Sequence, residues 1–222
     1  MSEVKVNKVS PRSGTTLTIG DSGDTTNIVG TLQNNGGALD GVTFKEGGTN
    51  FTNSLLVGTD GTGTLNDANS NTGVGVGVLG ALTTGDNNVA VGLNALDVNT
   101  TGAENTALGA NALDANTTGE KNVAIGKDAL TTDTLGSRSI AIGHSSLKNQ
   151  NFTSATNSNN VAVGFFAGED ITTAVCNTII GSQAGEKITT GSNNVAVGFD
   201  SLSSNTTGAN NVAVGKDSLK TN

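Results

Sequence analysis

The sequence predicts an all-β fold: a parallel β-solenoid of about nine coils of 15–21 residues, preceded by an extended β segment at the N-terminus. One observation behind this is a ten-residue phrase, Asn-x-Val-Ala-Val/Ile-Gly-x-x-Ala/Ser-Leu, that recurs along the chain. The other is composition, because 222 residues contain 32 Gly and only 34% hydrophobic residues. So few bulky side chains cannot fill one large core, whereas stacked coils need only small apolar sets at fixed positions.

The glycine of the phrase sets the period of the chain. It recurs at steps of 17, 17, 17, 21, 17, 17 and 17 residues, at Gly92, Gly109, Gly126, Gly143, Gly164, Gly181, Gly198 and Gly215. A glycine in every period, beside β-branched residues, argues against helices, since Gly in a helix costs about 1 kcal/mol relative to Ala. The period also differs from the heptad of a coiled coil.

Residues 1–52 do not show the repeat clearly, and we expect them to form an N-terminal docking or attachment segment. Residues 15–19 read as a short strand, and Lys5, Lys8 and Arg12 make the first residues basic. A polar arm on the surface is the alternative. The aspartates in residues 21–24 and 60–63 lack the spacing of a calcium-binding loop, so we expect no metal there. The repeats then fill residues 53–222, with residues 53–58 as a degenerate first copy.

The strand of each repeat, for example Val89-Ala90-Val91, places its two valines on one face and its alanine on the other. The alanine position never carries a charged residue; it is filled by Ala90, Ala107, Ala124, Ala141, Ala162, Ile179, Ala196 and Ala213. Both faces therefore look buried. Because a solenoid has only one inside, the second face predicts packing against another copy of the same chain.

A second row of residues, four positions before each glycine, suits the corners of the coils. It reads Asn88, Asn105, Asn122, Ser139, Asn160, Asn177, Asn194 and Asn211. Asn tolerates left-handed backbone conformations, and stacked amides can bond to one another along the axis. The four extra residues lie within 148–159, where we expect a loop that bulges outward without breaking the stack.

Composition narrows the possible partners. The net charge is -8, and clustered Lys and Arg are lacking, which argues against nucleic acid or an anionic membrane as partner. Cys176 is the only cysteine, so no disulfide forms within the chain. The start lacks a signal-peptide pattern, and no run approaches the roughly 18 apolar residues of a membrane span, so we expect no export and no membrane insertion.

We expect no catalytic, cofactor-binding or metal-binding residue. His144 is the only histidine and sits at a position of varied residues, which indicates a lateral or exposed site. A ring of three such histidines around a metal is the sharper alternative. Asp97 and Asp114 occupy equivalent positions on adjacent coils, as an acid pair would, but a solvated acidic corner is the simpler interpretation. Phe165, Phe166 and Phe199 predict an apolar patch used for core or trimer packing, with ligand contact as the alternative.

The repeated phrase resembles the head repeats of trimeric autotransporter adhesins over residues 74–219. That resemblance implies a left-handed parallel β-roll in which three chains share one core, and hence a homotrimer. The 17-residue step is longer than the usual coil of that family. The sequence also shows no pattern of a signal peptide, a coiled-coil stalk or a membrane-anchoring barrel, so we do not expect a surface adhesin of that class unless the sequence is a fragment.

Residues 6–24 resemble the N-terminal segment of tail-fibre proteins of tailed phages. That resemblance implies a non-enzymatic structural virion protein, assembled in the host cytoplasm: a trimeric tail fibre or spike that mediates attachment. Its N-terminal segment would contact other virion proteins, and the shaft would face a receptor on the host surface. Because exposed strand edges invite pairing, we expect the C-terminal end to abut another protein or to be covered by chain crossing in the trimer. The alternatives are an exported adhesin head that binds host surfaces and, in third place, an ice-binding solenoid; an enzyme ranks last.

Overall fold

The computed structural model describes residues 38–39, 42–48, 51–58 and 65–220, all of which lie in one compact unit of the chain, Asn34–Asn222. Most of the predicted docking segment falls outside these residues. So do the strand expected at residues 15–19 and the aspartate clusters of residues 21–24 and 60–63.

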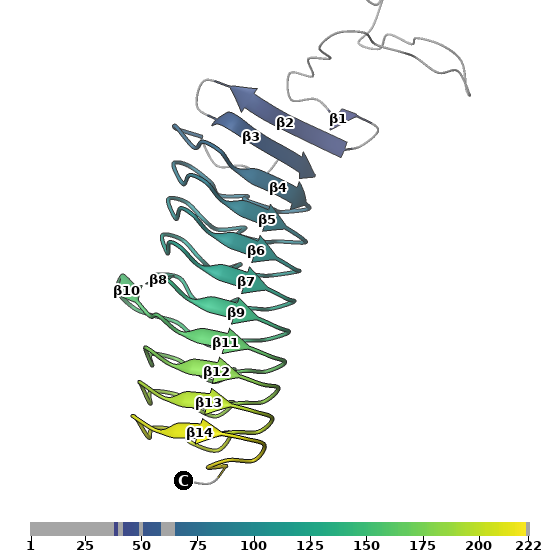
Figure 1. The fold of residues 1–222 in the computed structure, drawn as a ribbon. Helices are drawn as coiled ribbons and strands as arrows, with labels where there is room; N and C mark the ends of the chain where they lie inside the picture. The colour runs from purple at the N-terminus through teal and green to yellow at the C-terminus, as the bar shows by residue number, and fades with distance from the viewer. Residues whose placement is uncertain (1–37, 40–41, 49–50, 59–64, 221–222) are drawn as a thin grey trace, which may run out of the picture. The chain divides into compact units, whose positions relative to one another are not determined.

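Nine coils stack on one another through a single parallel sheet (Figure 1), as the period predicts, and the described residues include no helix. Each coil contributes one short strand. These are β4 (Thr72–Gly75), β5 (Val89–Val91), β6 (Thr106–Leu108), β7 (Val123–Ile125), β9 (Ile140–Ile142), β11 (Val161–Val163), β12 (Thr178–Ile180), β13 (Val195–Val197) and β14 (Val212–Val214).

A hairpin precedes the first coil. β2 (Val42–Gly48) and β3 (Phe51–Gly58) are antiparallel, β1 (Ala38–Leu39) pairs with β2, and β3 pairs in parallel with β4, Leu55 lying opposite Thr72. Residues 55–58 therefore hold the strand position of a coil, which confirms residues 53–58 as a degenerate repeat. Leu56 is buried opposite Gly73, where an added Cβ would come within 2.3 Å of the leucine Cδ2. Glycine replaces the usual alanine there because the hairpin already fills that space.

The interior of the stack is built from two apolar rows. The alanine row consists of the middle residue of each strand. Each member lies opposite the equivalent residue of the next strand, as Ala90 lies opposite Ala107. The leucine row comes four residues after the strand-ending glycine and consists of Leu79, Leu96, Leu113, Leu130, Leu147, Gly168, Gly185, Leu202 and Leu219. Both rows are fully buried apart from Leu219 in the last coil, so the core is a narrow column of small and medium side chains.

The predicted ladder of corner asparagines is confirmed. In the asparagine row, each side-chain Oδ1 accepts the backbone N–H of the equivalent residue one coil on, at 2.9–3.0 Å, as Asn105 does from Asn122. The side-chain Nδ2 donates to a backbone carbonyl of the same turn, Gly119 in the case of Asn105, at 2.8 Å. The backbone assignment was wrong, however, because the left-handed residue is the one before, for example Glu104 with φ 59°.

The 21-residue coil keeps the register of the sheet, as expected, with Ile140 opposite Val161. Its extra residues form a side loop in which β8 (Gly136–Ser137) pairs with β10 (Thr156–Asn157). The loop also supplies Gln150 to the interior, where its amide donates to Asp133 and to the hydroxyl of Ser139. Gln150 thus bridges the one place where Ser139 interrupts the asparagine row.

Candidate functional site

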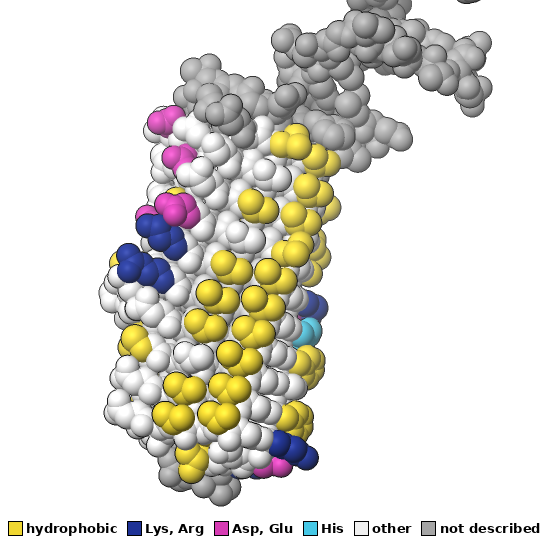
Figure 2. Space-filling view, viewed as in Figure 1, with side chains coloured by type: hydrophobic (Ala, Val, Ile, Leu, Met, Phe, Trp, Pro, Cys, Tyr) yellow, Lys and Arg dark blue, Asp and Glu magenta, His cyan; other side chains and the backbone are white. Residues whose placement is uncertain are grey.

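The outward side of the sheet is apolar along the whole stack. Its strand face comprises the first and third residues of β5 to β14, sixteen side chains of which fourteen are aliphatic: Val89, Val91, Thr106, Leu108, Val123, Ile125, Ile140, Ile142, Val161, Val163, Thr178, Ile180, Val195, Val197, Val212 and Val214. All are half-buried or exposed, whereas every residue between them is buried. Figure 2 shows them as two adjoining columns. The chain buries the alanine side by itself; whether another copy covers the other side stays a prediction.

A further column borders the strand face where the strands end. This corner column is the residue after each strand-ending glycine: Val76, Leu93, Ala110, Lys127, His144, Phe165, Ser182, Phe199 and Lys216. Outside β14, Val76, Leu93 and Phe165 are the most exposed large hydrophobic side chains of the described residues, at 55%, 51% and 49%. The varied residue types at this position had indicated only a lateral site. Its apolar members are visible in the sequence once the position is known to lie beside the strand face.

His144 lies in this column and is half-buried against aromatic rings. Its ring stacks on Phe165 at 5.3 Å between centroids and meets the edge of Phe166 at 5.6 Å. The two phenylalanine rings are 3.9 Å apart. Phe199 lies two coils further on and instead has the Lys216 ammonium 5.8 Å from its ring centre. The predicted three-residue patch is therefore a cluster of Phe165, Phe166 and His144, with Phe199 outside it.

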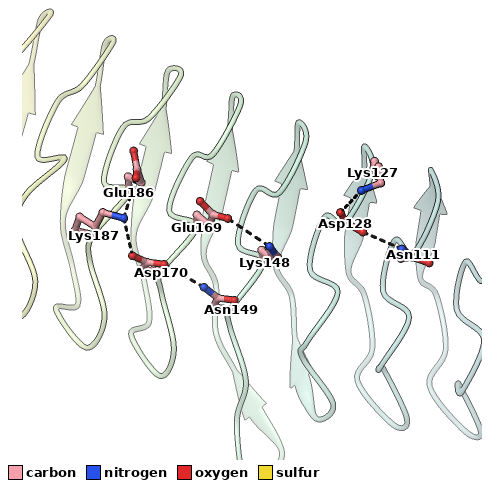
Figure 3. A network of polar contacts seen from close by, with 9 residues as sticks. All are labelled: Asn111, Lys127, Asp128, Lys148, Asn149, Glu169, Asp170, Glu186 and Lys187. Carbon is pink, nitrogen blue, oxygen red and sulfur yellow. Dashed lines mark hydrogen bonds and ion pairs between the residues drawn. The ribbon is translucent and has the colours of Figure 1, made fainter.

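The side of the coils beyond the corner column is polar and pairs its own charges from coil to coil (Figure 3). Lys187 bridges Glu186 and Asp170, at 2.9 and 3.1 Å, and Lys148 approaches Glu169 at 3.6 Å. The hydrogen bonds that the Lys187 ammonium donates to Glu186 and Asp170 raise its pKa. These charged groups are paired with one another, so they need no partner molecule to neutralise them. We therefore interpret this polar face as a side of the coil that faces solvent.

Asp128 belongs to the same polar face. Burial alone would raise its pKa, but hydrogen bonds from Lys127 and Asn111, at 2.6 and 2.9 Å, outweigh burial and lower it. One coil earlier, Asp114 shows the opposite balance: burial first, and then the charges of Asp97 and Asp128, raise its pKa. Asp97 and Asp114 are thus close enough to interact, as equivalent residues of adjacent coils should be.

A row of threonines at the opposite corner is used for stacking. The hydroxyls of Thr83, Thr100, Thr117, Thr172 and Thr189 each donate to a backbone carbonyl one coil on, at 2.9–3.1 Å. These hydroxyls therefore hold adjacent coils together, while the threonine that follows each of them, for example Thr118, is exposed.

Within residues 65–220 and the described strands before them, no three His, Cys, Asp or Glu side chains lie close enough together to hold a metal ion. No helix there has the length and hydrophobicity to cross a membrane. What the arrangement offers chemically is a long apolar surface, made of the strand face and the corner column, next to a self-paired polar one. Comparison of the chain with protein-family models, with curated proteins and with solved structures finds no match.

Proposed function

We propose that the chain is a non-enzymatic structural protein, the shaft of a homotrimeric tail fibre or spike on a phage particle. The observation that supports this most is the strand face, which stays apolar through every coil while the polar face pairs its own charges. Monomeric proteins in water rarely expose so large a contiguous apolar surface, and such surfaces commonly mark interaction sites.

The free energy gained by burying the strand face, compared with the cost of association, favours a partner that runs the whole length of the stack. Fully burying one aliphatic side chain stabilises by about 1.5–3 kcal/mol, so covering fourteen that are already partly buried yields on the order of 10 kcal/mol. Association itself costs about 4–15 kcal/mol. A partner that covered one or two coils would not recover that cost. Another copy of this chain carries an apolar face of matching length and repeat, which makes it the simplest partner.

Two parts of the proposal, the trimeric state and the location on a phage particle, rest on the two resemblances of the sequence. The resemblance to the head repeats of trimeric adhesins supports the trimer. The resemblance of residues 6–24 to tail-fibre proteins supports a location on the virion. There the N-terminal segment would bind other virion proteins, and the repeats would point towards a receptor on the host surface. In this role the shaft needs length and rigidity, which stacked coils with hydrogen bonds at every corner provide.

Native mass spectrometry tests the assembly. The wild-type protein should appear at three times the chain mass of 21.9 kDa. Ile142→Asp places a charge in the middle of the strand face and should dissociate the trimer, because burying an unpaired carboxylate costs several kcal/mol. Thr118→Asp, at an exposed position of the opposite corner, is the matched control and should stay trimeric. A folded wild-type protein that remains at 21.9 kDa would contradict the proposal.

The virion role has a separate test. A chain without residues 1–52 should still form the shaft but should be missing from assembled phage particles, as detected by antibody labelling in electron micrographs. Its incorporation at the wild-type level would exclude the docking role of the N-terminal segment.

A further inference from the structure

We infer that the copies meet through two different surfaces, the corner column of one copy packing against the strand face of the next; this arrangement rests on the homotrimer proposed above. A native trimer whose strand face met only the strand faces of its neighbours would satisfy the proposed function but not this inference.

The first observation is that exposed apolar side chains do not stop at the strand face. Val76, Leu93 and Phe165 in the corner column are more exposed than any strand-face side chain outside β14. Figure 2 shows hydrophobic side chains along the edge of the two strand columns, with basic side chains and the histidine between some of them. A partner that covered the strand face alone would leave the most exposed apolar side chains in water.

The second observation is that the two surfaces meet at an angle. The glycine between them has φ of 121–144° in every coil, a range that L-residues rarely adopt, and it turns the chain sharply at the end of the strand. An added Cβ at Gly126 would also lie 2.5 Å from the Gly143 carbonyl oxygen, so only glycine allows the coils to stack at this corner. The molecule therefore has an edge along the stack with the apolar strand face on one side and the mainly apolar corner column, interrupted by Lys127, His144, Ser182 and Lys216, on the other.

Symmetry then separates two forms of assembly. A two-fold pair is isologous: both copies use the same patch, and two facets that meet at an angle cannot both lie flat against one neighbour, so one facet of each copy would stay exposed. A closed three-membered ring is heterologous, because each copy presents one surface to the neighbour on its left and another to the neighbour on its right. Two apolar facets that share an edge match the ring.

The charged members of the corner column do not oppose this packing. Lys127 and Lys216 are each followed by an aspartate to which the ammonium group is paired, at 2.6 Å to Asp128 and 3.8 Å to Asp217. The Lys127 ammonium thus turns towards the polar face, whereas the Lys216 ammonium also lies over the ring of Phe199 within the column. The aliphatic stems of both lysines remain along the column. Contact with a neighbouring strand face would cover the stems without burying an unpaired charge.

Thiol cross-linking tests the arrangement in the full chain. In a Cys176→Ser background, Val161→Cys places a thiol in the strand face and Phe165→Cys one in the corner column of the same coil. When the two single-cysteine proteins are unfolded, mixed and refolded together, a short bis-maleimide should produce covalent two-chain species on a denaturing gel. No chain can cross-link to itself, because none carries both thiols. Either single-cysteine protein refolded alone should leave single chains. A mixture of the Thr118→Cys and Val161→Cys proteins, which moves one thiol to the opposite corner, is the matched control and should not cross-link.

Native mass measured on the same samples separates the possible failures. A monomer overturns both the inference and the proposed trimer. A trimer in which the mixed Val161→Cys and Phe165→Cys proteins give no covalent two-chain species overturns the inference alone. Covalent dimers formed by the Val161→Cys protein refolded alone indicate a two-fold contact through the strand face and also overturn it.

Discussion

At the scale of single residues, the corners are held by buried amides that bond to the backbone. Each asparagine of the ladder from Asn88 to Asn194 is buried and both accepts from and donates to the backbone, so one side chain satisfies two peptide groups that water cannot reach. Leaving either group unpaired would cost about 1–3 kcal/mol. The ladder therefore fixes the corner geometry as firmly as the sheet fixes the strands.

Asp133 departs from this neutral pattern and gives the stability a pH dependence. It occupies a buried position that carries Asn99, Asn116 and Asn205 in other coils, and it accepts from the Gly136 N–H and from Gln150. Burial raises the pKa of its carboxyl above the ordinary 3.8, in spite of these hydrogen bonds. The folded state therefore favours the protonated form, and the stability that Asp133 contributes is present below pH 3.8 and lost as the pH rises through the raised pKa.

We expect Asp133→Asn to remove this contribution. The melting temperature of the variant minus that of the wild type should rise between pH 3 and pH 8, a trend that thermal melts followed by circular dichroism can measure. Asp128→Asn is the control of opposite sign, because the pKa of Asp128 is lowered and its stabilisation is lost as the pH falls. Its difference from the wild type should fall over the same range. Parallel curves for Asp133→Asn and the wild type would contradict the account.

At the scale of one coil, the interior is filled by exchanging volume between two positions. Where the leucine row holds glycine, the buried residue three positions later is isoleucine: Gly168 goes with Ile171, and Gly185 with Ile188. An added Cβ at Gly168 would lie 3.1 Å from the Ile171 Cδ1. The backbone does not exclude leucine there, since φ is 58° at Gly168 and 49° at Leu147.

We expect Gly168→Leu alone to overpack the coil and to lower the free energy of unfolding by about 1–3 kcal/mol. Ile171→Ala alone should cost about 2–5 kcal/mol through the cavity that it leaves. The double variant should lose less than the sum of the two, by about 0.5–3 kcal/mol, because the new leucine fills that cavity. Urea titrations of the four proteins measure the coupling, and strictly additive losses would show that the two positions do not share the space.

The features of a coil that could be predicted from the sequence are those set by residue types with a strong conformational or hydrogen-bonding preference. The steps between glycines predicted the strands, and the asparagine row predicted the ladder, because both residue types have strong backbone or hydrogen-bonding roles. The left-handed leucines, with φ of 47–54°, were not predictable, since leucine rarely adopts that conformation. The only sign was that Gly168 and Gly185 stand in the same row. The inward turn of Gln150 and the exposed valine side also depend on tertiary packing that a spacing pattern does not encode.

At the scale of the whole stack, stability should be close to a sum over coils and their contacts, because every coil touches only its neighbours. The register supports this: the strands pair residue for residue from β5 to β14, and the 21-residue coil absorbs its extra residues in a side loop. The unit that can be removed without disturbing the rest is therefore 17 residues long, wherever in the period the cut falls.

We expect that excision of residues 104–120, which joins Ala103 to Lys121, leaves a folded protein. The new neighbours Val89-Ala90-Val91 and Val123-Ala124-Ile125 keep alanine against alanine, and Asn88 meets Asn122 in the ladder. The stack should shorten by one strand spacing, about 4.8 Å, in small-angle X-ray scattering, and its melting temperature should fall by only a few degrees. Excision of residues 104–119, one residue fewer, is the control. It leaves one extra residue in a corner that lacks the side loop of the 21-residue coil, and this residue displaces the neighbouring ladder amides from their backbone partners, so that protein should be markedly less stable. If both excisions folded equally well, the row-by-row matching of the coils would not be what holds the stack together.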